Sequence, residues 1–569
     1  MTFTITSKLY RWRVRTSGAL LVVLSLLSPA CWSSRNNGLY YGRVVIPREQ
    51  EFRWSDGGLP QVFDPAFAAA PPDTDVVRAL FEGLTDYDSR TLQPMPAVAE
   101  RWESSDDGRV WTFYLRRDAR WSTGEPVTAG DFVRSWERTL RLGDLAPHTE
   151  LLNNIVGARS YVGSVKTAQA SAAAAVTARN EERANETHLA GVTEVNANVL
   201  RVKLQEPNAD FPALVAHPVF RPVKVTDENQ SARLSAPNLI SNGAFSLTKA
   251  DPEQVQLQRA ENYWGKAEVS LQRVDFVKTQ DAEDALASYQ AGNIDAVTNA
   301  PFEPLALKLL APYADYRRTT YAALTYYTFN TARAPFDDVR VREALAIVID
   351  RERISEEEMK GATEPANSFL PLKSIQQGSD SVVPKSASLD KDHERARRLL
   401  AEAGYENGNG FPMIRLLINR NDQQRQVAEA VAASWRSVLG IETQIISKPW
   451  EEYEVMVRSG EYDLVRRGAV MQTTDEASNL RMLFAQPQEP TPSPAATASP
   501  SGSQAKPTPE KNQKSFETEA EAMRQLAGIP IYFASSYSLV KPYVIGFESN
   551  VLDAPSLKNV RIDTNFKTK

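Results

Sequence analysis

The sequence predicts an α/β protein built from several domains. Its 569 residues exceed what a single hydrophobic core usually organises, so three or four domains are expected. In the second half of the chain, strand patterns alternate with helical patterns, which indicates mixed, mostly parallel sheets. The helical patterns cover 394–404, 426–439 and a segment that opens at Trp450, and the strand patterns cover 414–418 and 441–446.

Near the N-terminus, local patterns predict the first elements of the fold. The β-branched run Val44-Val45-Ile46 predicts a short strand. Residues 73–84 carry apolar side chains on one side of a helical wheel and predict a helix.

Residues 81–140 combine a turn, two strands and a helix in a compact order. Asp106-Asp107-Gly108 favours a tight turn, and the run 110–115 is rich in the β-branched and aromatic residues of strands. A helix is expected from about 130 to 140, because apolar residues recur there every four positions. These residues are Phe132, Trp136 and Leu140. Such large aromatic side chains predict a core and not a reaction centre.

The first 31 residues have the composition of a targeting segment. Basic residues precede the apolar run 18–27, which is too short to span a bilayer and has the length of a signal-peptide core. Cys31 follows this run and is the only cysteine, so no intrachain disulfide can form. Its position predicts a lipidated N-terminus, although Ser28 and Pro29 also leave ordinary cleavage or an uncleaved anchor open.

Composition argues against several functional classes. A net charge of −6 does not suit a general nucleic-acid binder. The four histidines lie far apart in sequence and lack the spacing of a metal site, and no phosphate-binding glycine motif is present. We therefore expect no cofactor, no metal and no enzymatic activity.

Three further stretches carry distinctive residue orders. Residues 241–265 contain NGAF and NYWG, residues 326–353 read YYTFNTARAPFDDVRVREALAIVIDRER, and residues 539–543 read LVKPY. Together with 81–140, they resemble the bacterial oligopeptide- and dipeptide-binding proteins, which are the extracytoplasmic receptors of peptide ABC importers.

The resemblance implies a periplasmic-binding-protein-like fold of two lobes and three domains. A peptide or similar solute would be captured between the lobes for ABC permease and ATPase subunits by a monomer in the periplasm or at the cell surface. The implied boundaries are a signal peptide at 1–31, a tether at 32–42, domain I at 43–82, 220–325 and 525–569, domain II at 83–219, and domain III at 326–524. Within domain III, the Pro/Ser/Thr-rich segment 486–514 is expected to be disordered.

The resemblance also assigns ligand-binding positions. Trp450 matches a pocket-wall tryptophan, and Arg466 matches an arginine that meets a peptide carboxylate. Gly468 matches the glycine that lets backbone approach the ligand. Three further positions are Gln424, where oligopeptide binders place a histidine, His148, where they place a pocket tyrosine, and Ala69, in the connection along the groove.

The departures from the family pattern leave two functions open. Gln472 stands where the family has the acid that pairs with the peptide ammonium, and Ala469 replaces an aromatic residue. Asp475 or Glu476 could supply the acid if the loop is shifted. One interpretation is a peptide receptor. The alternative is a degenerate scaffold that acts as a cell-envelope interaction or structural lipoprotein.

Overall fold

The computed structural model describes residues 39–159, 189–226, 229–230, 232–236, 239–371, 389–484, 516 and 518–567. The predicted signal peptide with Cys31, the tether up to residue 38 and the Pro/Ser/Thr-rich segment 486–514 lie outside these residues. Within the described residues, no helix is both long and apolar enough to cross a membrane.

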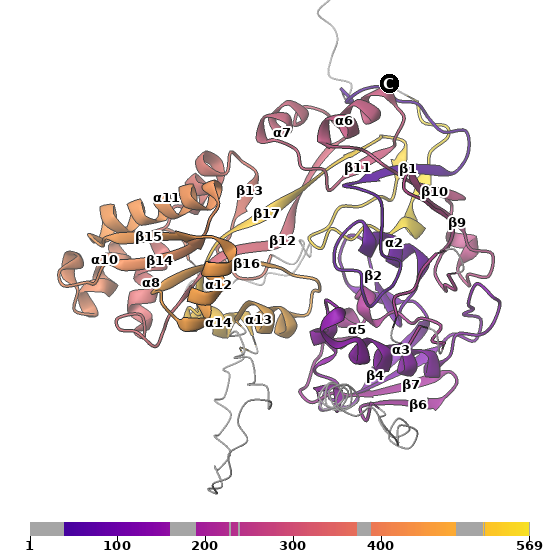
Figure 1. Cartoon of the computed structure of the whole chain (residues 1–569), viewed down its shortest axis with the longest axis horizontal. Helices are drawn as coiled ribbons and strands as arrows, with labels where there is room; N and C mark the ends of the chain where they lie inside the picture. Colours follow the sequence, from indigo (N-terminus) through magenta and orange to yellow (C-terminus); the bar gives the residue numbers. More distant parts are fainter. Residues whose placement is uncertain are drawn as a thin grey trace, which may run out of the picture.

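A large mixed sheet of eleven strands runs through the whole molecule (Figure 1). Its order is β15 (Thr443–Lys448), β14 (Ile414–Asn419), β16 (Leu464–Val470), β12 (Tyr316–Phe329), β17 (Gly528–Val540), β11 (Ala296–Thr298), β1 (Glu51–Asp56), β10 (Arg273–Val277), β9 (Gln254–Arg259) and β8 (Phe245–Ala250). The short β13 (Thr363–Pro365) also pairs with β17. The predicted mixed α/β fold is thereby confirmed.

The expectation of mostly parallel sheets is wrong. Among the described residues, parallel pairing in this sheet joins β1 to β10 and β11, and β14 to β15 and β16. The other ladders of this sheet are antiparallel. The alternating pattern at 394–459 describes only β14 and β15, whereas hairpins and the two long strands supply most of the remaining ladders.

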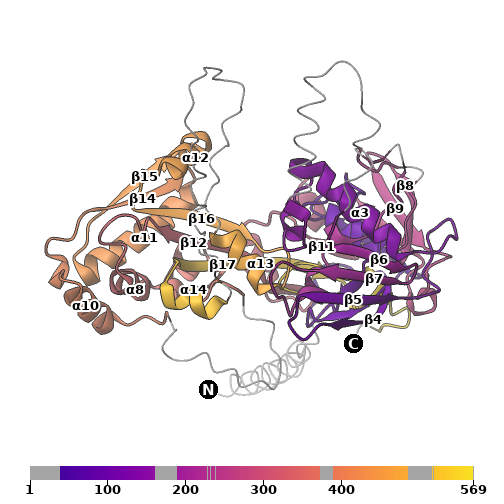
Figure 2. The ribbon, with the colours of Figure 1, turned by 90° about the horizontal axis from the view of Figure 1, so that it is seen from below.

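Two long strands, β12 and β17, connect the two lobes of the molecule (Figures 1 and 2). The N-terminal part of β12 pairs with the C-terminal part of β17, next to β11, and the C-terminal part of β12 pairs with β16. Their shared register shifts between Thr320 and Leu324. We call the β1, β8–β11 side lobe 1 and the β13–β16 side lobe 2. Each lobe has its own large hydrophobic core.

Lobe 2 packs helices against its part of the sheet. They are α8 (Val339–Ile347), α10 (His393–Glu402), α11 (Asp422–Leu439), α12 (Trp450–Ser459), α13 (Glu476–Phe484) and α14 (Glu519–Gln525). α11 begins where the Asn421 side chain accepts the Gln424 amide, and ends at Gly440 with φ 72°. Its buried face carries Val427, Val431 and Trp435 at helical spacing, which fixes the helix against lobe 2.

Lobe 1 adds a four-stranded antiparallel sheet and several helices. The sheet order is β4 (Ala99–Ser104), β5 (Val110–Leu115), β7 (Val199–Lys203) and β6 (Val192–Asn196). The helices are α2 (Asp73–Leu80), α3 (Ala129–Leu142), α5 (Phe211–Leu214), α6 (Ala282–Ala291) and α7 (Pro304–Leu310), and the small ladders are β2 (Thr85–Tyr87) with β3 (Pro94–Pro96) and β18 (Val544–Ile545) with β19 (Arg561–Ile562). The predicted strand at 110–115 and the predicted helix near 130–140 are present.

The first predicted strand is misplaced. Residues 44–46 form no strand, and Val45 is exposed. The strand lies instead at β1, whose Phe52 and Trp54 are fully buried between β10 and β11. Residues 51–56 have a weaker intrinsic preference for strands than residues 44–46. They form the strand nevertheless, because they pair with β10 on one edge and β11 on the other.

Candidate functional site

Two of the predicted ligand-binding residues meet in a polar cluster of lobe 2. Arg466 of β16 pairs with Tyr327 of β12, and its Nη2 lies 3.2 Å from Thr325 Oγ1. Gln424, in the first turn of α11, donates its Nε2 to Tyr532 Oη at 2.8 Å. Thr325 and Tyr532 face each other in the β12–β17 ladder. Residues Thr325, Tyr327, Gln424, Arg466 and Tyr532 are called the lobe-2 polar cluster below.

The lobe-2 polar cluster contains buried polar atoms without partners. These are Arg466 Nε, Tyr327 Oη and Gln424 Oε1. A buried polar group without a hydrogen bond costs about 1–3 kcal/mol, so such atoms call for a reason. Burial, with a smaller effect of Tyr532, raises the pKa of Tyr327, so its hydroxyl stays a neutral donor. The Arg466 guanidinium and the Tyr327 hydroxyl can donate to the oxygen atoms of a carboxylate, whereas Gln424 Oε1 is an acceptor and suits an N–H or O–H group.

Two further predicted ligand-binding residues lie near Arg466 in sequence, Gly468 on the same strand and Trp450 at the start of α12. A Cβ on Gly468 would lie 3.0 Å from Arg466 Nη2, so a larger residue would crowd the guanidinium. Trp450 opens α12 and stacks on Tyr453 with ring centroids 5.3 Å apart. With 62% of its surface exposed, Trp450 is available to a ligand or a partner and does not fill the core.

In lobe 1, the structure brings His148 and Ala69 together. His148 Nε2 lies 3.2 Å from the Ala69 carbonyl oxygen, and Ala69 is exposed. The His148 ring also contacts His217 edge-to-face, with centroids 5.0 Å apart. Sequence analysis missed this histidine pair, because 69 positions separate the two residues without a shared motif.

His217 is expected to make the protein less stable in mild acid. Burial, with smaller effects of His148 and Arg78, lowers the pKa of His217 well below its usual value. Below about pH 6.5, the His217 side chain is therefore protonated in the unfolded chain but stays neutral in the folded protein. The contribution of neutral His217 to stability is complete above about pH 6.5 and decreases as the pH falls below it. The Nδ1 atom accepts the Val219 amide at 3.1 Å. His217→Asn keeps an acceptor without the titration.

The measurement is the melting temperature between pH 7.5 and 5. The wild-type protein should lose more stability over this range than His217→Asn does. Equal declines in the two proteins would show that another group dominates.

The two acids that could replace the missing ammonium partner are already engaged. Asp475 is buried, accepts Asn208 Nδ2 at 2.8 Å and accepts the Ser478 amide at 2.8 Å at the start of α13. Glu476 accepts the Glu519 amide. Gln472 stays half-buried at the position of the family acid. The Asn208–Asp475 bond joins lobe 1 to lobe 2.

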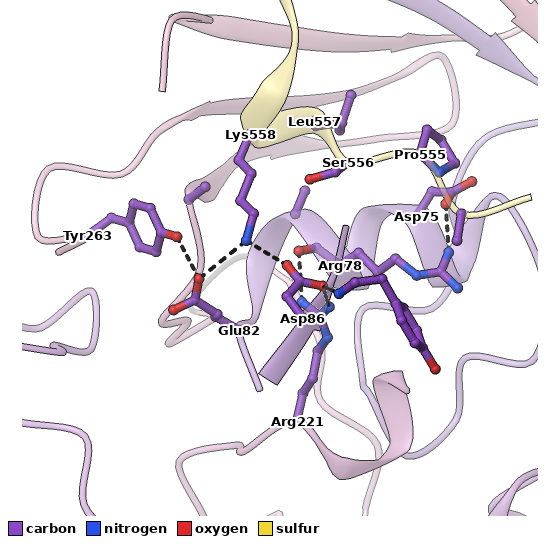
Figure 3. A pocket seen from close by; sticks show the side chains of 14 residues that line it. Asp75, Arg78, Glu82, Asp86, Arg221, Tyr263, Pro555, Ser556, Leu557 and Lys558 are labelled. Atoms are coloured by element: carbon purple, nitrogen blue, oxygen red, sulfur yellow. Dashed lines mark hydrogen bonds and ion pairs between the residues drawn. The ribbon is translucent and has the colours of Figure 1, made fainter. Parts of the chain in front are cut away.

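A separate charged network surrounds a small cavity in lobe 1 (Figure 3). Lys558 lies 2.7 Å from Asp86 and 3.7 Å from Glu82, and Arg221 lies 3.0 Å from Asp86. Tyr263 Oη donates to Glu82 at 2.5 Å. The cavity of about 20 Å³ holds no more than one water molecule, and Lys558 and Arg221 pair with the carboxylates of Asp86 and Glu82. We interpret this network as structural.

The pKa values of Asp86 and Glu82 are consistent with carboxylates paired to Lys558 and Arg221. Burial alone would raise the pKa of Asp86, but Lys558 and Arg221 outweigh it and lower that pKa to about 2. Burial raises the pKa of Glu82, against the opposing effects of Lys558 and Tyr263. No group of three or more His, Cys, Asp or Glu side chains suited to a metal ion occurs in the part of the chain that the structure describes.

Comparisons with known proteins agree with this architecture. The family model for bacterial extracellular solute-binding proteins, family 5 (middle), matches residues 93–491. The periplasmic oligopeptide-binding protein OppA of Escherichia coli K12 is 30% identical over 534 residues, covering 91% of this chain and 94% of its own. The periplasmic murein peptide-binding protein MppA of the same strain is 29% identical, covering 89% and 92%.

Two solved structures of MppA are similar to this chain over nearly its whole length. The unliganded open form gives a TM-score of 0.71 at 27% identity, covering 91% of this chain and 98% of that chain. A second structure, of the Escherichia coli murein tripeptide-binding protein MppA, gives 0.60 at 28% identity, covering 91% and 99%. Of these two structures, this chain superposes better on the unliganded open form. The chain belongs to the bacterial extracellular solute-binding proteins of family 5.

Proposed function

We propose that this protein is the substrate-binding component of a peptide-type ABC importer, which captures a peptide between its lobes outside the cytoplasm. Family membership supports solute binding, and the names of OppA and MppA support a peptide as the solute. The observation that carries the proposal is the lobe-2 polar cluster, where Arg466 Nε, Tyr327 Oη and Gln424 Oε1 are buried without partners. No catalytic step is part of this function.

In this proposal, the lobe-2 polar cluster receives a carboxylate of the peptide. Arg466 supplies the charge, and Gly468 keeps space beside its guanidinium. Trp450, His148 and Ala69 offer exposed or half-buried surface along the peptide. Gln472 meets the amino end as a neutral group, so a charged ammonium contributes little to affinity there. Closure would proceed by bending β12 and β17.

The same proposal covers location, partners and domain organisation. Cys31 carries a lipid anchor, residues 32–42 form the tether, and the monomeric receptor delivers its peptide to ABC permease and ATPase subunits. Domain I comprises 43–82, 220–325 and 525–569, domain II comprises 83–219, and domain III comprises 326–524. Cys31→Ser should release the protein from the membrane fraction, whereas unchanged sedimentation would argue for a different anchor.

Mass spectrometry of ligand that co-purifies with the protein, combined with peptide thermal shifts, tests the binding function. Each peptide should be compared with its C-terminally amidated and its N-terminally acetylated form. We expect amidation to abolish most of the shift, because the carboxylate loses its charge. Acetylation should change it little, because Gln472 carries no charge. The reverse pattern would contradict the assigned orientation.

A second function has specific support in the sequence. Gln472 and Ala469 replace the acid and the aromatic residue of the family, and Asp475 is committed to Asn208 and α13. A scaffold that acts in the cell envelope as an interaction or structural lipoprotein would need no ligand. Absence of co-purified ligand and of any shift with peptides and sugars would favour this scaffold.

A further inference from the structure

Two buried aspartates of lobe 1 contact each other where β1 ends and α2 begins. Asp56 is the last residue of β1 and Asp75 lies in the first turn of α2. Their exposed fractions are 0% and 2%, and their carboxyl groups are within hydrogen-bonding contact. Two carboxylates both accept hydrogen bonds and repel each other, so this contact needs an explanation.

One oxygen of each carboxyl group is already bonded. Asp56 Oδ1 accepts Thr298 Oγ1 and Asn299 Nδ2, both at 2.6 Å. Asp75 Oδ1 accepts Arg78 Nη1 at 2.9 Å. The second oxygen, Oδ2, is buried without a partner in both residues. A single proton between the two groups would satisfy both orphan oxygens at once, because it turns one carboxyl group into a donor.

The surroundings hold more negative than positive charge. Asp553, from the segment after β18, is also buried and faces Asp56 and Asp75, and its Oδ1 accepts Ser536 Oγ at 3.0 Å. Arg78 is the cation that acts on all three aspartates. The other titratable groups facing Arg78 or Asp553 are Tyr321 of β12, Tyr87 of β2 and His217. Three carboxylates against one guanidinium leave an excess of negative charge that a bound proton would reduce.

We propose that Asp56 and Asp75 share one proton at neutral pH, and that this proton fastens β1 to α2 beside the lobe-1 root of the crossing strands. Asp553, whose charge acts on the pair, shows how near those strands are, because its partner Ser536 belongs to β17 and pairs with Thr319 of β12. Loss of the proton leaves two charges in contact in a dry interior, so lobe 1 loosens next to the strands on which the lobes move. This proton site is independent of the ligand at the lobe-2 polar cluster.

The sign of the pH dependence is opposite to that of His217. Burial raises the pKa of Asp75 well above its usual value, with a further increase from Asp56, and burial raises the pKa of Asp553 to about 6. The folded protein therefore holds protons that the unfolded chain, with aspartate pKa values near 3.9, has released. This contribution to stability is full below about pH 4 and is lost as the pH rises through the folded-state pKa values.

Proton release on unfolding gives a direct test with the full protein. Calorimetric unfolding enthalpies are measured at pH 7 in phosphate and in Tris, whose different ionisation enthalpies report the number of protons released. We expect Asp75→Asn to release about one proton fewer than the wild-type protein on unfolding, because the asparagine amide does not ionise and so has no proton to release. Asp56→Asn should have the same effect. Glu253→Gln, on the surface, is the matched control and should release the wild-type number.

Equal proton release by wild-type protein, Asp75→Asn and Asp56→Asn would overturn the proposal. If these variants fail to fold, infrared spectroscopy of the wild-type protein replaces them. A protonated carboxylic acid carbonyl band at pH 7 that disappears on raising the pH supports the shared proton, and its absence refutes it. Asp75→Asn should also flatten the decline of melting temperature between pH 5 and 9, which a purely structural aspartate would not produce.

Discussion

Replacing Lys558 by methionine is expected to lower the free energy of unfolding by about 3–5 kcal/mol. The ammonium lies 2.7 Å from Asp86 and 3.7 Å from Glu82, and Glu82 is almost fully buried. Methionine retains much of the volume but leaves the buried Glu82 without a cation beside Asp86, which keeps only Arg221 as a charged partner. Breaking a buried pair costs far more than its net contribution suggests, because a charge remains without a partner. Calorimetry at pH 7 measures the loss.

The matched control is Lys448→Met. Lys448 lies 2.9 Å from Glu452, but both side chains are more than one-third exposed, and such surface pairs contribute about 0–1 kcal/mol. A difference of less than 1 kcal/mol between the two variants would contradict the structural role of the cavity network. Part of the loss in Lys558→Met should return at low pH, since protonation removes the repulsion between Glu82 and Asp86.

Replacing Arg466 by alanine is expected to weaken binding of a peptide with a free carboxylate by roughly 10- to 150-fold. A charge-assisted hydrogen bond contributes about 1.5–3 kcal/mol, which corresponds to that range of affinity. Folding should change less, because the only hydrogen bond of the Arg466 guanidinium within the described residues is the 3.2 Å contact with Thr325, and its Nε is unpartnered. Isothermal titration with a peptide and with its amidated form measures the effect, which should vanish for the amide.

Arg467→Ala is the control for this experiment. Neighbouring residues of a strand point to opposite faces, and Arg467 interacts with Tyr326 and Tyr453 instead of Thr325. It should leave the preference for a free carboxylate intact. A loss of affinity that is equal for Arg466→Ala and Arg467→Ala, or equal for both forms of the peptide, would exclude the lobe-2 polar cluster as a carboxylate site.

Local sequence patterns correctly predicted those helices and strands whose conformation is determined by their own residues. The aromatic face of α3 and the turn before β5 are visible in the residues themselves, and both are present. The strand at 44–46 failed because the real strand, β1, depends on its two neighbours and not on its own composition. The crossing of β12 and β17 joins residues about 200 positions apart, so local patterns could not reveal it.

The same limit applies to the candidate site. The family resemblance pointed to Arg466 and Gln424, and the structure brings them into one cluster through Tyr532. Tyr327 and Tyr532 were missed because a buried tyrosine in a strand looks like any core residue until the surroundings of its hydroxyl are known, which are an unpartnered site for Tyr327 and Gln424 for Tyr532. The contacts of His148 with His217 and of Asp56 with Asp75 are likewise set by tertiary folding alone.

The central position of β17 has a consequence for biogenesis. β17 lies between β12 and β11, yet it follows every other strand of this sheet in the chain. During synthesis, lobe 1 therefore stays open along one strand edge until residues 528–540 have been made, and Lys558 follows later still. A nascent chain that cannot close this sheet early remains unfolded for longer, so β11, β12 and β13 wait for their last partner.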